Sequence, residues 1–143
     1  MIANDLIQAA LVARLKGMAA FVALLGSKDD LKEAQWQGTT FVYPAFRIRM
    51  GTQVPQAGYG CAGSSIPFSL ICKTEDASSL NVNNMAGIAA QLLHGATWCD
   101  IFNGVRFVSI RAVGIINAVR EDERTWKAEA SFQAIVEPAA KAP

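Results

Sequence analysis

The stretch from Arg124 to Glu137 alternates apolar and polar side chains almost residue by residue. Its apolar set is Trp126, Ala128, Ala130, Phe132, Ala134 and Val136, and of the residues between them only Ile135 is not polar. An apolar face and a polar, solvent-exposed face that alternate with a period of two residues are typical of a half-buried antiparallel strand. A change of strand register by one residue would expose the side chains of Trp126 and Phe132 to solvent. The register of this strand is therefore strongly specified. We expect the other elements to pair with it or to pack against it.

The composition predicts a single globular domain with little charge. The chain has 143 residues, of which 52% are hydrophobic and 17% charged, and its net charge is +1. This length predicts one domain over residues 1–143 with a core of its own. The low charged fraction indicates that other subunits cover part of the apolar surface. A general nucleic-acid-binding protein normally has a larger basic excess, so that class is disfavoured.

Apolar residues three and four apart predict two main helices. The first begins at Asn4 or Asp5 and carries its apolar stripe as far as Leu25. Gly17 interrupts it and predicts a break into two shorter helices, since glycine costs about 1 kcal/mol relative to alanine inside a helix. The second helix begins after Ser78 or Ser79 and ends at His94 and Gly95. The segment from Ser27 to Gln37 fits either one more helical turn or a polar connection.

Neither a membrane anchor nor an oxidising compartment is expected. Arg14 and Lys16 lie inside the apolar run of the first helix and make membrane insertion costly, so we expect a soluble protein without a signal peptide. Cys61, Cys72 and Cys99 are odd in number and widely spaced, which favours reduced thiols. Cys72 lies in a strand pattern and is expected in the core.

Three further strands are predicted at Thr40–Met50, Ile66–Thr74 and Val105–Val119, with a bulge at Gly114 in the last of them. Turns are expected from Trp98 to Gly104 and from Arg120 to Arg124, and residues 138–143 are expected to form a frayed tail. The fold class is therefore α+β, an antiparallel sheet of about four strands with the two main helices packed on one face.

A long glycine-rich connection from Gly51 to Ser65 joins the first two of these strands. It fits a flexible hairpin loop or an assembly arm, because a loop this long in a compact domain is usually functional or disordered. We predict that it is mobile in an isolated subunit and becomes ordered when subunits pack against it. The candidate assembly interface comprises Arg47, Arg49, Gln53, Val54, Pro55, Tyr59 and Cys61.

The sequence carries little that predicts chemistry. His94 with Cys99 and Asp100 is the one candidate nucleophilic group, and a histidine at a helix end is more often a dipole partner than a base. No metal-ligand spacing and no phosphate-binding glycine motif is present, so we expect no catalytic residue, metal or cofactor. A competing hypothesis is a small thiol-dependent enzyme that uses Cys99 or Cys61 with His94.

Four arginines on the predicted strands are a further candidate for a site. Arg47, Arg49, Arg106 and Arg111 could form a basic face that meets phosphate or an acidic neighbour if they share one side of the sheet. An exposed charged face that discourages aggregation is the simpler interpretation.

The order of these elements resembles that of tail terminator proteins of tailed phages and prophages. The resemblance covers roughly residues 4 to 137. It rests on the arginine strand before the glycine-rich loop and on four sequence segments: Asn4-Asp5-Leu6-Ile7, Gln91-Leu92-Leu93-His94-Gly95, Val105-Arg106-Phe107, and Trp126-Lys127-Ala128-Glu129-Ala130-Ser131-Phe132. Other head–tail joining proteins and tail tube proteins are similar in architecture.

The resemblance implies a non-enzymatic structural protein of the virion tail that is assembled in the host cytoplasm. In that family a homohexameric ring caps the tail tube, stops its polymerisation and provides the surface that docks to the head. The implied partners are further copies of the chain, the tail tube protein and the head–tail connector protein. DNA is implied only as passing through the lumen of the ring, and no membrane partner or cofactor is implied.

Overall fold

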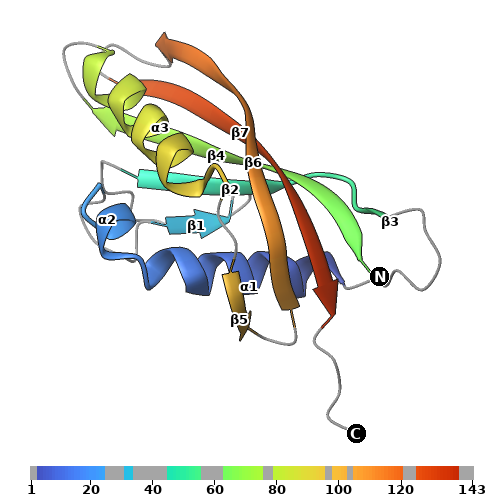
Figure 1. Cartoon of the computed structure of the whole chain (residues 1–143). Coiled ribbons are helices and arrows are strands. Elements are labelled where there is room, and N and C mark those ends of the chain that lie inside the picture. Colours follow the sequence, from blue (N-terminus) through green and yellow to red (C-terminus); the bar gives the residue numbers. More distant parts are fainter. Residues whose placement is uncertain are drawn as a thin grey trace, which may run out of the picture.

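The computed structural model describes residues 3–24, 31–33, 45–55, 63–75, 79–95, 98–102, 105–120 and 125–138 (Figure 1). The helices are α1 (Asn4–Lys16), α2 (Ala19–Val22) and α3 (Leu80–Leu93). The strands are β1 (Leu31–Glu33), β2 (Ala45–Met50), β3 (Val54–Pro55), β4 (Ser64–Glu75), β5 (Trp98–Phe102), β6 (Val105–Arg120) and β7 (Thr125–Pro138). Within these residues the strands form one sheet in the order β1-β2-β4-β7-β6-β5, and β3 pairs with β4 outside this path.

The predicted alternating strand is present as β7, and it lies in the middle of the sheet. It pairs antiparallel with β4 on one side and with β6 on the other, so that Phe132 lies opposite both Phe68 and Ala112. The four long strands β2, β4, β7 and β6 are neighbours in that order, and the helices α1 and α3 contribute to the core on one face of the sheet. The predicted α+β fold is confirmed.

Besides β3, which lies in the predicted glycine-rich loop, two further short strands were not expected. β1 lies within the segment assigned to a helical turn or a polar connection and pairs parallel with β2, with Leu31 opposite Phe46. β5 lies within the predicted turn from Trp98 to Gly104 and pairs with the start of β6. Strands of three and five residues are too short to show a clear alternation, and the backbone edges of β2 and β6 decide where they form.

The first helix is interrupted where Gly17 predicts it. α1 ends at Lys16, the N–H of Gly17 donates to the carbonyl oxygens of Ala13 and Arg14, and α2 begins two residues later. The bulge predicted at Gly114 is also present, as a register shift between Ala112 and Gly114. No helix in the described part of the chain is long and apolar enough to cross a membrane.

Aromatic stacking fills the core between the sheet and the helices. Phe132 is 1% exposed and stacks on Phe68 with a ring-centroid separation of 5.1 Å. Phe21 of α2 stacks on Phe46 at 4.6 Å. Cys72 is buried, as the sequence predicts, and Leu11, Leu15 and Leu93 of the helices are buried with it, while Leu92 is only partly buried. Trp126 is only half-buried, so its predicted full burial is wrong; it lies near the start of β7, opposite Thr74 and Arg120, where the core ends.

The bounds of the predicted glycine-rich loop also need correction. β4 begins at Ser64, two residues before the predicted strand, and Val54 and Pro55 pair with Ser65 and Ser64 to form the small strand β3. β4 therefore pairs first with β2 and then, closer to the loop, with β3, so the unpaired loop is shorter than predicted. Residues 56–62, which include Tyr59 and Cys61, lie outside the described residues, as do residues 121–124 and 139–143.

Candidate assembly interface

The end of β2, the strand β3 and the start of α1 meet at one corner of the molecule (Figure 1). The side-chain amide of Asn4 donates to the carbonyl oxygen of Gly51 at 3.5 Å, and the side-chain amide of Gln53 donates to the Asn4 side-chain oxygen at 2.8 Å. These bonds hold the helix start against the chain that leads into β3. Leu6 and Val54 are both exposed beside them. We call Asp5, Leu6, Gln53 and Val54 the β3–α1 corner.

Of the predicted interface residues that the structure describes, Arg49, Val54 and Pro55 are exposed and Gln53 is half-buried. Arg47 is only 6% exposed and donates from Nη1 to the carbonyl oxygen of Phe46 at 3.0 Å. Arg49 forms an ion pair with Glu129 of β7. Arg47 therefore stabilises the sheet. The accessible part of the predicted interface consists of Arg49, Gln53, Val54 and Pro55.

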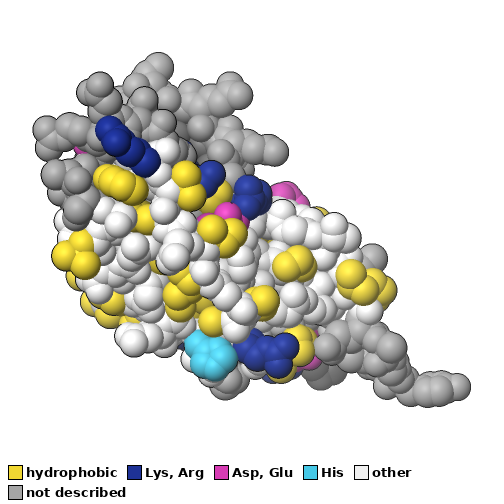
Figure 2. Space-filling model, turned by 90° about the horizontal axis from the view of Figure 1, so that it is seen from above, with side chains coloured by type: hydrophobic (Ala, Val, Ile, Leu, Met, Phe, Trp, Pro, Cys, Tyr) yellow, Lys and Arg dark blue, Asp and Glu magenta, His cyan; other side chains and the backbone are white. Residues whose placement is uncertain are grey.

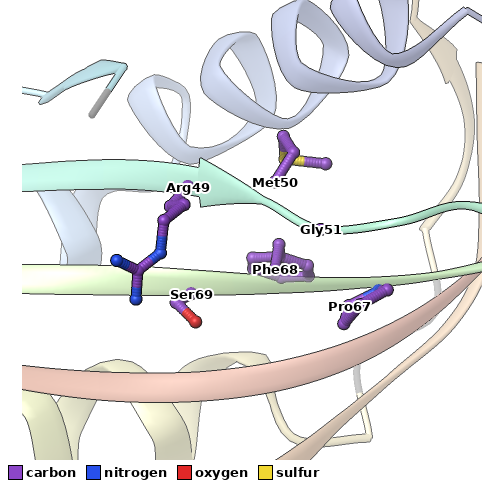
Figure 3. A pocket seen from close by; sticks show the side chains of 6 residues that line it. All are labelled: Arg49, Met50, Gly51, Pro67, Phe68 and Ser69. Carbon is purple, nitrogen blue, oxygen red and sulfur yellow. The ribbon is translucent and has the colours of Figure 1, made fainter. Parts of the chain in front are cut away.

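A shallow depression of about 260 Å³ lies where β2 ends against β4, lined by Arg49, Met50, Gly51, Pro67, Phe68 and Ser69. Figure 3 shows the Met50 side chain on the side of α1, with Arg49 and Ser69 on the other side of the two strands. Arg49 is the one ionisable group of this lining, and it is already paired with Glu129. The depression therefore lacks the acid or base that a catalytic site requires.

Gly51 is needed for the close approach of β2 and β4 in this depression. Its N–H donates to the Pro67 carbonyl oxygen at 2.7 Å, and a Cβ at Gly51 would lie 2.6 Å from Cγ and 3.1 Å from the carbonyl oxygen of Pro67. Gly51→Ala is therefore expected to lower the free energy of unfolding by about 1–3 kcal/mol, measured by urea denaturation. Gly87→Ala in α3 is the matched control.

A Cβ at Gly87 meets no atom within 4 Å, so Gly87→Ala should stabilise the helix by up to about 1 kcal/mol. Equal effects of the two substitutions would contradict the close packing of Gly51.

The predicted basic face exists but is largely neutralised. Register places the strand arginines on the face of the sheet opposite the core, together with Glu129 and Glu137 of β7. Glu129 pairs with Arg49, and Glu137 pairs with Arg106. Arginines already matched by carboxylates attract phosphate weakly, so the two ion pairs reduce the attraction of this face for nucleic acid.

Of the residues in the thiol-enzyme hypothesis, the structure describes the side chain of His94 alone, and it gives His94 a structural role. The backbone N–H of Ala112 in β6 donates to His94 Nδ1 at 3.0 Å, so the imidazole closes the end of α3 against the sheet. Burial raises the pKa of the Cys72 thiol, and the nearby Glu129 carboxylate raises it further, which keeps this thiol protonated and unreactive. The side chains of Cys61, Cys99 and Asp100 lie outside the described residues.

A search of the described residues finds no cluster of histidine, cysteine, aspartate or glutamate that could hold a metal ion.

One set of exposed apolar residues was not predicted from the sequence. It lies at the start of α3 and along the second half of β6: Leu80, Val113, Ile115, Ile116 and Val119. These residues do not share one face of the sheet, because Ile115 lies opposite Ala130 on the core face, while Ile116 and Val119 lie opposite Glu129 and Lys127 on the other face. The signal that could have revealed it is the absence of charge from Ala112 to Val119, in a strand whose bulges break the alternation between core and solvent.

Comparisons with known proteins identify the fold. No family model matches the chain, and no curated protein matches it in sequence. Among solved structures, the chain is similar to a chain of the structure titled "Virion of native gene transfer agent (GTA) particle", with a TM-score of 0.67 and 22% sequence identity. The match covers 93% of this chain and 96% of that chain. The two chains therefore share one fold over nearly their whole lengths.

Proposed function

We propose that this protein is a structural component of a phage-like virion and has no enzymatic role. The observation that carries the proposal is the fold shared with a chain of a gene transfer agent virion, which covers 93% of this chain and 96% of that one. The shared fold therefore accounts for nearly all of this chain.

Within the virion, we propose the role of tail terminator. The resemblance of Asn4–Ile7, Gln91–Gly95 and the β6–β7 pair to that family supports this role. The protein would form a homohexameric ring on the head-proximal end of the tail tube, stop tube growth and dock to the head connector, with DNA passing through the lumen. Another head–tail connector or a tail tube protein is the alternative, because these share the architecture.

The exposed surfaces fit an assembling protein. Val54 at the β3–α1 corner is 54% exposed, and Leu80 at the start of α3 is 73% exposed. Large apolar side chains clustered in water are typical of surfaces that bind other proteins. We propose that the accessible predicted residues, Arg49 to Pro55, form part of one interface, together with the loop over residues 56–62.

The proposed role is tested by imaging the purified protein and by adding it to its tail tube protein. We expect closed rings in negative stain and tubes whose growth stops once the protein has bound to one end. A tail tube protein would instead form long tubes by itself, and a connector would form rings without affecting tube length. A monomer with a reactive, low-pKa thiol would contradict the proposal and favour the thiol-enzyme hypothesis.

The loop supplies a variant for the same experiment. Pro55 and Ser64 lie opposite each other in the β3–β4 pair. Replacing residues 56–63 by Asn-Gly would therefore connect them through a two-residue hairpin turn. The variant should fold with unchanged stability and lose ring formation, because the proposed arm is removed while the sheet is kept. Hydrogen exchange in the parent protein should slow in the loop on assembly, and equal exchange in subunit and assembly would contradict a role for the loop.

A further inference from the structure

The second half of β6 lies at an edge of the sheet. β5 pairs only with the start of this strand, where Trp98 lies opposite Phe107 and Phe102 lies opposite Val105. Over residues 108–120, no strand among the described residues pairs with β6 on the side away from β7. An edge of this length offers backbone N–H and C=O groups to a strand of another molecule, unless other groups of the same chain bind them first.

The composition of this edge favours pairing with other strands. Neither an ionisable side chain nor a proline occurs from Ala112 to Val119. Ile115 on the core face is 47% exposed and Ile116 on the opposite face is 55% exposed, so the strand presents β-branched apolar side chains to water on both faces. Seen from above, the molecule shows hydrophobic side chains scattered among polar ones with few charged groups between them (Figure 2). An uncharged apolar edge strand promotes edge-to-edge association unless another element covers it.

Helix α3 binds backbone donors of this edge with a side chain at each of its ends. Near the start of the helix, the side-chain oxygen of Asn83 accepts a hydrogen bond from the N–H of Ala118 at 3.1 Å. At the end of the helix, His94 Nδ1 accepts one from the N–H of Ala112 at 3.0 Å. An N–H group that donates to one of these acceptors is not available to the carbonyl oxygen of an incoming strand.

The chain that leaves α3 makes a third bond to the same edge. The N–H of Gly95 donates to the carbonyl oxygen of Ile110 at 2.7 Å, and Gly95 has a φ of 78°. Glycine adopts a positive φ without steric cost, which ends the helix abruptly and brings His94 onto β6. The position of the imidazole is therefore fixed by the way the helix ends.

We propose that Asn83 and His94 are edge caps: they bind the backbone donors of β6 and so prevent a strand of a second copy from adding to the sheet at this edge. A second copy is the partner that they exclude, because two uncharged segments of the same sequence do not repel each other. Asparagine is a weaker helix former than alanine, and the bond to Ala118 gives a reason for Asn83 inside α3. The inference goes beyond the proposed function and does not rest on it, since any subunit with such an edge needs protection.

Removal of the two acceptors tests the edge caps in solution. Asn83→Leu and His94→Leu each replace an acceptor by an apolar group of similar size. The double leucine variant should stay folded and form, at equal concentration, species that sediment faster than any of the parent. The concentration at which it associates should be lower by about 10-fold or more, as expected when backbone donors bond to a second copy. His94→Asn should behave as the parent, because the asparagine side-chain oxygen replaces Nδ1 as the acceptor.

Asn84→Leu is the matched control on the same helix. Asn84 is exposed, and within the described structure it makes no hydrogen bond to β6. The substitution adds the same apolar side chain without releasing a backbone donor, so the sedimentation of this variant should equal that of the parent. Association of Asn84→Leu as strong as that of Asn83→Leu overturns the inference, because any exposed leucine would then be sufficient.

Hydrogen exchange measures the two capped amides directly. The N–H groups of Ala112 and Ala118 should be protected in the parent. In the leucine variants, kept dilute enough to prevent association, they should exchange faster by about 10-fold or more, while Asn84→Leu leaves them unchanged. Fast exchange of both amides in the parent overturns the inference, even if the leucine variants fail to fold.

A further substitution shows whether the new association uses the β6 edge. Ile116→Lys places a charge on this edge at an exposed position, so adding it to the double leucine variant should restore parental sedimentation. Association that persists with Ile116→Lys overturns the inference, and so does a folded double leucine variant that sediments as the parent does. None of these results bears on the proposed function, which fails instead when the parent neither forms rings nor limits tube growth.

Discussion

Replacing Phe132 by alanine is expected to lower the free energy of unfolding by about 3–5 kcal/mol. Phe132 is 1% exposed, stacks on Phe68 and lies on the central strand, where neighbouring strands and the helices limit any collapse around the cavity. A loss of this size removes much of the stability of a small domain, which is typically about 5–15 kcal/mol. Urea denaturation followed by far-UV circular dichroism and tryptophan fluorescence measures it.

Phe132→Leu and Phe68→Ala serve as controls for this prediction. Leucine refills most of the volume, so Phe132→Leu should cost less than half as much as the alanine variant. The double variant Phe68→Ala/Phe132→Ala should cost less than the sum of the two single variants, because each single variant already breaks the stack. A cooperatively folded Phe132→Ala protein of near-parental stability would show that the core lies elsewhere.

The second large effect is expected at alkaline pH and concerns the buried thiol of Cys72. Burial raises the pKa of this thiol above its ordinary value of 9.0, and the Glu129 carboxylate adds to the effect. The thiol therefore stays protonated in the folded chain, while it ionises above about pH 9 in the unfolded chain. The stabilisation is complete below the unfolded pKa and falls as pH rises above it, by about 1.4 kcal/mol per pH unit. Between pH 9 and 11 the loss from Cys72 is about 2.3 kcal/mol, because the unfolded thiol is only half ionised at pH 9.

Cys72→Ala isolates this contribution, since every other titrating group is common to both proteins. The difference in unfolding free energy between parent and variant should shrink by the stated slope above pH 9. Alkylation by iodoacetamide, located by mass spectrometry, should leave Cys72 unmodified in the folded chain and modify it after unfolding. A pH-independent difference, or alkylation of Cys72 in the folded protein, would contradict the burial of the thiol.

Local periodicity determined much of this fold. The alternation from Trp126 to Val136 is sufficient to predict that β7 is a strand with one buried face, whereas its central position follows from its pairing with β4 and β6. The break at Gly17 and the bulge at Gly114 follow from the backbone preferences of single residues. The resemblance to tail terminators likewise rests on the order of helices and strands, which can be predicted from the sequence.

Tertiary structure alone decided the remaining features, because each depends on atoms far apart in sequence. β1 and β5 form where the backbone edges of β2 and β6 are free to pair, and no local pattern marks them. The neutralised arginines depend on the register that places Glu129 beside Arg49 and Glu137 beside Arg106. The exposure of Ile115 and Ile116 on opposite faces of β6 depends on where α3 and the bulges of this strand lie. A sequence specifies which residues are apolar, whereas packing determines which of those residues remain in water for a partner to bury.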